Sequence, residues 1–382
     1  MNDRERFRAT MHYQSRDRVP LYDFNYWDET IPAWHQQGLP GFITRRDAGD
    51  YFGLDCSLGG GEPPDWTTSV NSCLQPWFEP KIIEDDGDLY TQIQADGVIV
   101  RKQRSSVSIP MHMGHTLTDR ESWNKHYKPR LNPDDHARYP ADLERRAAVW
   151  RDENRGHPVI ISAGSLFGWI RDWMGLENVS LAVYDDPAWF EEMITTVTDL
   201  QLACLSKILS TGGRFDAASM WEDMCYNAGP LLSPTHFKRY LAPNYRRITD
   251  LLGKYGIDLV YLDCDGKIDE LLPLWLDAGV NCMFPIEIGN WADPVRFRKL
   301  YGKSLRLMGG FDKHILAASK ADIDAEIRRL TPLVEEGGYI PFCDHRVPPD
   351  VPLENYVHYC ERARHVWGGG VNLRPMPAAT SG

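Results

Sequence analysis

Hydrophobic and polar positions follow a regular pattern from about residue 155 to the C-terminal region. Short apolar runs of strand length, beginning with HPVIISAG at 157–164, are each followed by a segment with helical periodicity. Six such units follow one another, and VPLYDF at 19–24 supplies a seventh strand. Apolar strands that alternate with amphipathic helices indicate a parallel sheet, and this many units favours a closed barrel. We therefore predict an α/β fold, a (β/α)8 TIM barrel.

The stretch from about 30 to 150 departs from this pattern. DGDLYTQIQADGVIVRKQR contains two alternating strands joined around Asp96-Gly97, which predicts an antiparallel β-hairpin. We interpret 30–150 as an N-terminal insertion over the barrel mouth, within a single catalytic domain at 1–367. The segment 368–382 is rich in Gly and Pro, which predicts a flexible C-terminal tail.

Composition narrows the class of protein. A chain of 382 residues with 42% hydrophobic residues can bury a full core. Its net charge of −12 argues against nucleic acid as a partner, because phosphate binding needs a cationic surface. No apolar run approaches the roughly 20 residues of a membrane span, and the eight cysteines form no CxxC pair. These features predict a cytoplasmic protein with reduced thiols and no membrane contact.

Residues able to bind a metal or exchange protons recur where the predicted strands end. In a barrel of parallel strands these ends face one shared pocket, so such residues are expected to converge. They are Glu222 in SMWEDM, Asp263 and Asp265 in VYLDCDG, Glu287 in FPIE, and Cys343, Asp344 and His345 in IPFCDH. Other interpretations stay open, since Asp265-Gly266 also suits a turn and His345 also suits a surface loop.

Four segments together resemble one superfamily. They are RERFRATMHYQSRDRVPLYDF, SMWEDMCYNAGPLLSPTHFKRYLAPNY, DCDGKIDELLPLWLDAGVNCMFPIE and GGYIPFCDHRVPPDVPLENY. The chain resembles the uroporphyrinogen decarboxylase superfamily, whose barrel also houses corrinoid-dependent methyltransferases and is similar to that of cobalamin-independent methionine synthase. The resemblance covers nearly the whole chain and implies a barrel enzyme.

The resemblance also implies a metal site. The methyltransferase branch binds zinc through a His-x-Cys pair and a later Cys, with a Glu about 20 residues past the pair in the methionine synthases. Here the pair positions hold Asp263 and Asp265, the Glu is Glu287 and the later Cys is Cys343. We expect Asp265, Glu287 and Cys343 to bind a divalent metal, with zinc as the first candidate. Two carboxylates make the site harder, so other divalent ions also suit it.

Aromatic residues near the predicted strand ends suggest the kind of substrate. The segment LYDFNYWDETIPAW stands where the decarboxylase branch has arginines that hold its tetrapyrrole, so porphyrinogen decarboxylation is not expected. A negative pocket with aromatic walls suits an aromatic or methylated cationic substrate. The residues predicted to bind it are Tyr22, Trp27, Phe167, Trp169 and Trp221.

These interpretations predict a metal-dependent methyltransferase of the demethylase type. It would move a methyl group from a small methylated substrate, for which an aromatic compound is one candidate, to a corrinoid partner protein or another acceptor. Glu222, His345 and Asp263 are the expected catalytic residues. Two alternatives remain, a metal-assisted lyase, decarboxylase or hydrolase that uses the same pocket, and a barrel that binds a ligand without catalysis.

Overall fold

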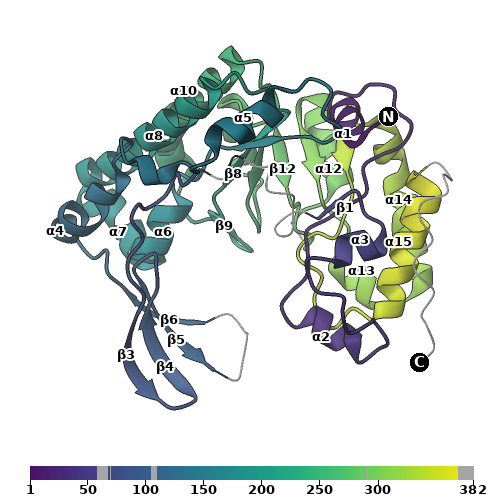
Figure 1. The fold of residues 1–382 in the computed structure, drawn as a ribbon, viewed down its shortest axis with the longest axis horizontal. Coiled ribbons are helices and arrows are strands. Elements are labelled where there is room, and N and C mark those ends of the chain that lie inside the picture. Colours follow the sequence, from purple (N-terminus) through teal and green to yellow (C-terminus); the bar gives the residue numbers. More distant parts are fainter. Residues whose placement is uncertain (58–67, 69, 105–109, 290, 369–382) are drawn as a thin grey trace.

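The computed structural model describes residues 1–57, 68, 70–104, 110–289 and 291–368 (Figure 1). The glycines at 59–61 and the predicted tail beyond Gly368 lie outside the described residues. No helix in the described part of the chain has the length and apolar character needed to cross a membrane.

Parallel strands form the centre of the fold. Six of them pair in the order β14-β13-β12-β11-β8-β7, and β1 pairs with β2 in a separate parallel pair. The strands are β1 (Tyr22–Asp23), β2 (Cys56–Ser57), β7 (Ile160–Ser162), β8 (Ala217–Trp221), β11 (Val260–Asp263), β12 (Cys282–Phe284), β13 (Arg306–Met308) and β14 (Tyr339–Ile340). Seven of these were predicted from the sequence, and β2 was not.

One interior cluster shows how the two groups of strands are arranged. Every one of the eight parallel strands contributes a side chain to it, from Tyr22 on β1 to Ile340 on β14. Phe7 and Met11 of α1 (Asp3–Met11) pack into the same cluster. A parallel bridge between Tyr26 and Val347 joins the segments that follow β1 and β14. The fold is therefore the predicted TIM-barrel-like arrangement, although no ladder joins β2 to β7 within the described residues.

Helices follow the strands and cover their outer faces. The larger core cluster lies between these helices and the strands, as the alternation of side chains along a strand requires. Ser233 caps the helical segment that begins at Pro234, because its side chain accepts a hydrogen bond from the His236 N–H. The helices after the strands are α6 (Gly168–Met174), α7 (Leu176–Asp185), α8 (Pro187–Leu209), α9 (Pro234–His236), α10 (Ala242–Lys254), α11 (Leu272–Asp277), α12 (Pro294–Tyr301), α13 (Lys313–Ala317), α14 (Lys320–Glu336) and α15 (Leu353–Trp367).

The predicted hairpin is part of a larger antiparallel sheet. β4 and β5 pair around the turn that contains Gly97, whose φ of +87° is one that glycine adopts readily. β3 and β6 extend this pair to four strands, and the sheet projects beyond α6 in Figure 1. The elements of 30–150 are α2 (Thr30–His35), α3 (Ala48–Phe52), β3 (Lys81–Asp86), β4 (Leu89–Ile93), β5 (Val98–Gln103), β6 (Met111–His115), α4 (Arg120–Ser122) and α5 (Leu143–Arg151).

Candidate functional site

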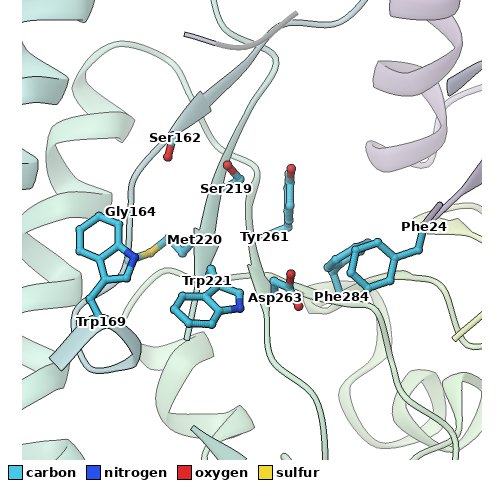
Figure 2. A pocket seen from close by; sticks show the side chains of 10 residues that line it. All are labelled: Phe24, Ser162, Gly164, Trp169, Ser219, Met220, Trp221, Tyr261, Asp263 and Phe284. Carbon is cyan, nitrogen blue, oxygen red and sulfur yellow. The ribbon is translucent and has the colours of Figure 1, made fainter. Parts of the chain in front are cut away.

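A cavity of about 250 Å³ opens among β7, β8, β11 and β12, and Figure 2 shows its walls. Trp221, Asp263 and Phe284 are register partners at the carboxyl ends of neighbouring strands. This is the end at which barrels of this type place their active sites. The cavity is lined by aromatic residues and by a few small or polar ones: Phe24, Trp169, Trp221, Tyr261 and Phe284, together with Ser162, Gly164, Ser219, Met220 and Asp263.

Three carboxylates meet beside this cavity. Asp223, Asp263 and Asp265 each offer an oxygen, and these oxygens lie within 4.8 Å of one another. Asp263 lines the first cavity, whereas Asp223 and Asp265 line a second one of about 430 Å³. The three residues, which we call the acidic triad, therefore stand between the two cavities.

Asp223 was not singled out in the sequence, although it follows Glu222 directly. Its φ of +44° is left-handed, which bends the chain immediately after β8. Its Oδ1 accepts a hydrogen bond from the Asp265 N–H at 3.2 Å. The bend thus brings the carboxylate of Asp223, and not that of Glu222, to the segment after β11.

The surroundings of the acidic triad disfavour ionisation of its carboxyl groups. Burial raises the pKa of Asp263 well above its usual range, and the nearby Asp223 and Asp265 carboxylates raise it further. Burial and the charge of Asp265 also raise the pKa of Asp223. In addition, Asp265 Oδ1 is buried without a hydrogen-bond partner in the described structure. A cation between these oxygens would relieve both conditions, so the triad fits a divalent ion that prefers oxygen ligands.

His345 reaches the acidic triad from the segment after β14. Its Nε2 lies 3.3 Å from Asp265 Oδ2, and its ring stacks on Trp27 with the centroids 5.3 Å apart. Phe24, which lines the first cavity, packs edge-on against the same ring at 5.6 Å. The structure therefore places His345 beside the acidic triad, with Trp27 stacked on its ring.

Glu287 lines the second cavity but is engaged by other groups. Its Oε2 accepts from the Gly266 N–H at 3.1 Å, and its Oε1 lies 3.2 Å from Lys313 Nζ. Lys313 Nζ also lies 3.2 Å from Oδ2 of the buried Asp344. Burial disfavours the Lys313 ammonium, but the two carboxylates outweigh this effect and raise its pKa. The sequence analysis missed Lys313, although it follows β13 at a position comparable to the other strand-end residues.

Glu222 is completely buried and makes hydrogen bonds through both oxygens. Oε2 accepts from Ser165 Oγ and from the N–H groups of Phe167 and Gly168, and Oε1 accepts from the Leu166 N–H and the Tyr245 hydroxyl. Burial raises the pKa of Glu222, whereas these hydrogen bonds lower it. The carboxylate holds the start of α6, and it lines neither cavity. The structure thus places Glu222, expected as an acid or base, outside the lining of the two cavities.

Cys343 lies away from the acidic triad. It pairs with Phe311 through a parallel bridge and packs in the outer core, whereas the preceding Phe342 belongs to the interior cluster. Burial raises the pKa of its thiol well above the usual range, which disfavours the thiolate that binds metals. The structure therefore does not group Asp265 with Glu287 and Cys343 as a possible ion site.

The predicted aromatic residues divide into two groups. Trp169 and Trp221 line the first cavity, as expected. Tyr22 is buried in the interior cluster and Phe167 in the outer core, and neither lines the cavities. In their place Phe24, Tyr261 and Phe284 complete the aromatic wall. Phe167 points to the outer core, whereas Tyr22 points inward but packs within the interior cluster.

Comparisons with known proteins agree with the fold. Residues 107–366 match the family model described as uroporphyrinogen decarboxylase (URO-D). A uroporphyrinogen decarboxylase of Syntrophotalea carbinolica is 25% identical over 176 residues, which are 45% of this chain and 48% of that protein. The enzyme of the same name from Geobacter sulfurreducens is 24% identical over 196 residues, 50% of this chain and 52% of its own. The chain spans about half the length of the curated relatives it matches.

A solved structure of a methyltransferase from Methanosarcina mazei superposes on the model. The TM-score is 0.59 at 14% sequence identity, and the match covers 95% of this chain and 98% of that one. At this identity the likeness concerns the fold.

Proposed function

The chain belongs to the uroporphyrinogen decarboxylase (URO-D) family, and on that premise we propose that it is a metal-dependent methyltransferase of the demethylase type. Its substrate would be a small methylated aromatic compound. One observation carries the proposal: the acidic triad stands at the edge of an aromatic-lined cavity of about 250 Å³ at the carboxyl ends of the strands.

Asp223, Asp263 and Asp265 are the residues that we propose hold the metal. Their donor set consists of carboxylate oxygens, which suits Mg²⁺, Mn²⁺ or Ca²⁺ better than the zinc expected from the sequence. A divalent ion bound there would supply a Lewis acid that polarises a substrate oxygen and stabilises it as a leaving group.

The chain's own residues bind and orient the substrate. Trp169, Trp221 and Phe284 offer ring faces for an aromatic compound. His345 holds Asp265 in place, and Glu222 holds the start of α6, the helix that carries Trp169. In the transfer, the methyl–oxygen bond of the substrate breaks and its electron pair stays on the oxygen. The methyl group bonds to a nucleophilic acceptor, which supplies the electron pair of the new bond. We propose that a corrinoid on a separate protein is this acceptor.

The charge of the site argues against a tetrapyrrole substrate. Among the described residues that line the two cavities, Arg171 is the one with a permanent positive charge, against four carboxylates: Asp223, Asp263, Asp265 and Glu287. Adding a polycarboxylate to such a site costs Coulomb energy. The volume of the first cavity is also below the roughly 300–1,000 Å³ typical of sites for drug-sized ligands.

A decarboxylase or lyase acting on a small substrate is the second candidate. It is favoured by Asp263, because a carboxyl group whose pKa is raised well above its usual range holds a proton that it can donate to a carbanion. This reaction needs no methyl acceptor, which separates it from the first candidate.

Metal binding by the purified protein tests the proposal. We expect calorimetric titration of metal-depleted protein to show one site for Mg²⁺, Mn²⁺ or Ca²⁺. Asp223→Asn and Asp263→Asn should each weaken it more than about tenfold, whereas Asp250→Asn on the exposed face of α10 should not.

Activity is then measured with methoxylated aromatic compounds and a corrinoid acceptor protein. Demethylation that requires both the metal and the acceptor supports the first candidate. Metal-independent decarboxylation supports the second. A third outcome is that no ion binds, and that the wild-type and Asp263→Asn proteins both bind the aromatic compounds but turn none of them over. A non-catalytic ligand-binding barrel is then the better description.

A further inference from the structure

The first cavity has a polar end that the proposed function leaves unused. Ser162 on β7, Ser219 on β8 and Tyr261 on β11 are direct register partners across three neighbouring strands. All three line the cavity, and Figure 2 shows their hydroxyl groups in a row on one side of it. We call these residues the hydroxyl row.

The hydroxyl row lies one layer below the reactive end of the cavity. Two residues further along the same strands come Trp221, after Ser219, and Asp263, after Tyr261. Because side chains two residues apart point to the same face, both layers face the cavity. At about 3.3 Å per residue, the layers are roughly 6.5 Å apart along the strands. This separation suits one aromatic ring that carries a substituent at each end.

The chemistry of the hydroxyl row selects a neutral group. Serine and tyrosine hydroxyls both donate and accept hydrogen bonds and carry no charge. No Lys, Arg or His is found among the described residues that line this cavity. A carboxylate would lack a counter-charge here, whereas a hydroxyl could both donate and accept.

We propose that Ser162, Ser219 and Tyr261 form a subsite for a neutral hydroxyl on the ring of the substrate, at the end opposite the group that reacts near Asp263. The substrate class is then a para-hydroxylated aromatic methyl ether. The identification of the reacting group as a methyl ether rests on the proposed function, but the recognition of the ring hydroxyl does not.

Binding of matched ring compounds, without acceptor or added metal, tests the subsite. We expect calorimetry to show that the wild-type protein binds 4-methoxyphenol about three- to tenfold more tightly than methoxybenzene, the effect of one or more neutral hydrogen bonds. 4-Methoxybenzoate should bind more weakly than 4-methoxyphenol, because its carboxylate finds no cation in the cavity.

Two variants test whether the hydroxyl row causes the preference for 4-methoxyphenol over methoxybenzene. Ser219→Ala and Tyr261→Phe should each reduce the ratio of the two dissociation constants toward one, while the affinity for methoxybenzene changes less than about twofold. Unchanged methoxybenzene binding also shows that the variants are folded. Tyr255→Phe, at an exposed tyrosine outside the cavity, and Ser206→Ala, on the exposed face of α8, are matched controls.

The outcomes separate this inference from the proposed function. Equal binding of 4-methoxyphenol and methoxybenzene by the wild-type protein, or no binding of either, overturns the subsite. A preference that both variants retain also overturns it. A preference that the variants lose, without methyl transfer in the activity assay, supports the subsite and removes the proposed reaction.

Discussion

Replacing Glu222 by Gln should destabilise the protein measurably, although the change is nearly isosteric. The Glu222 carboxylate is fully buried and accepts five hydrogen bonds, three of them from the backbone N–H groups of Leu166, Phe167 and Gly168. With the Gln amide nitrogen at the Oε1 position, the Tyr245 hydroxyl can rotate to accept, but the Leu166 N–H loses its acceptor.

The magnitude follows from these contacts. A buried N–H without a partner costs about 1–3 kcal/mol, and each remaining hydrogen bond loses about 1 kcal/mol when its acceptor changes from charged to neutral. Relief of the buried charge offsets the weakened hydrogen bonds, because burial raises the pKa of Glu222 in spite of them, and this leaves about 2 kcal/mol for the N–H without an acceptor. A chain of 382 residues has an unfolding entropy of about 0.8 kcal/mol/K, so the melting temperature should fall by about 2–3 °C.

Thermal unfolding followed by circular dichroism measures this difference. Glu361→Gln, at an exposed position on α15, is the matched control and should change the melting temperature by less than about 1 °C. If Glu222→Gln melts within about 1 °C of the wild-type protein but abolishes activity, Glu222 acts in the chemistry and the positioning role is refuted.

Two further predictions concern the ion pairs beside Glu287. Lys313→Met should lower the free energy of unfolding by about 1–1.5 kcal/mol in urea titrations at pH 7, because it removes the cation beside the buried Asp344, whose carboxyl group then takes up a proton; no measurable loss would contradict this. Burial raises the pKa of Asp344 from 3.8 to about 6, so its contribution to stability is complete below about pH 4 and is lost as the pH rises through 6. The loss amounts to about 3 kcal/mol, and urea titrations at pH 4.5 and 7.5 should show a smaller pH effect in Asp344→Asn than in the wild-type protein; equal pH effects would argue against it.

The sequence by itself was enough to predict the class of fold. The alternation of apolar strands and amphipathic helices is a local property, since each element needs one face toward the core whatever its neighbours are. For the same reason the hairpin around Gly97 was visible, because its turn and its alternating strands are adjacent in the chain. Asp263 and Asp265 were also visible, because they end an apolar strand.

Only the tertiary structure decided which side chains meet. Whether a residue at a strand end faces the interior or the helices depends on its parity along the strand and on how the chain turns afterwards. Parity places Phe342 inside and Cys343 outside, and the left-handed turn at Asp223 brings that residue to the acidic triad while Glu222 holds α6. Only the structure shows that Lys313 pairs with Glu287, which lies 26 positions away in sequence. Such contacts join residues from different strands, and no pattern within one segment contains them.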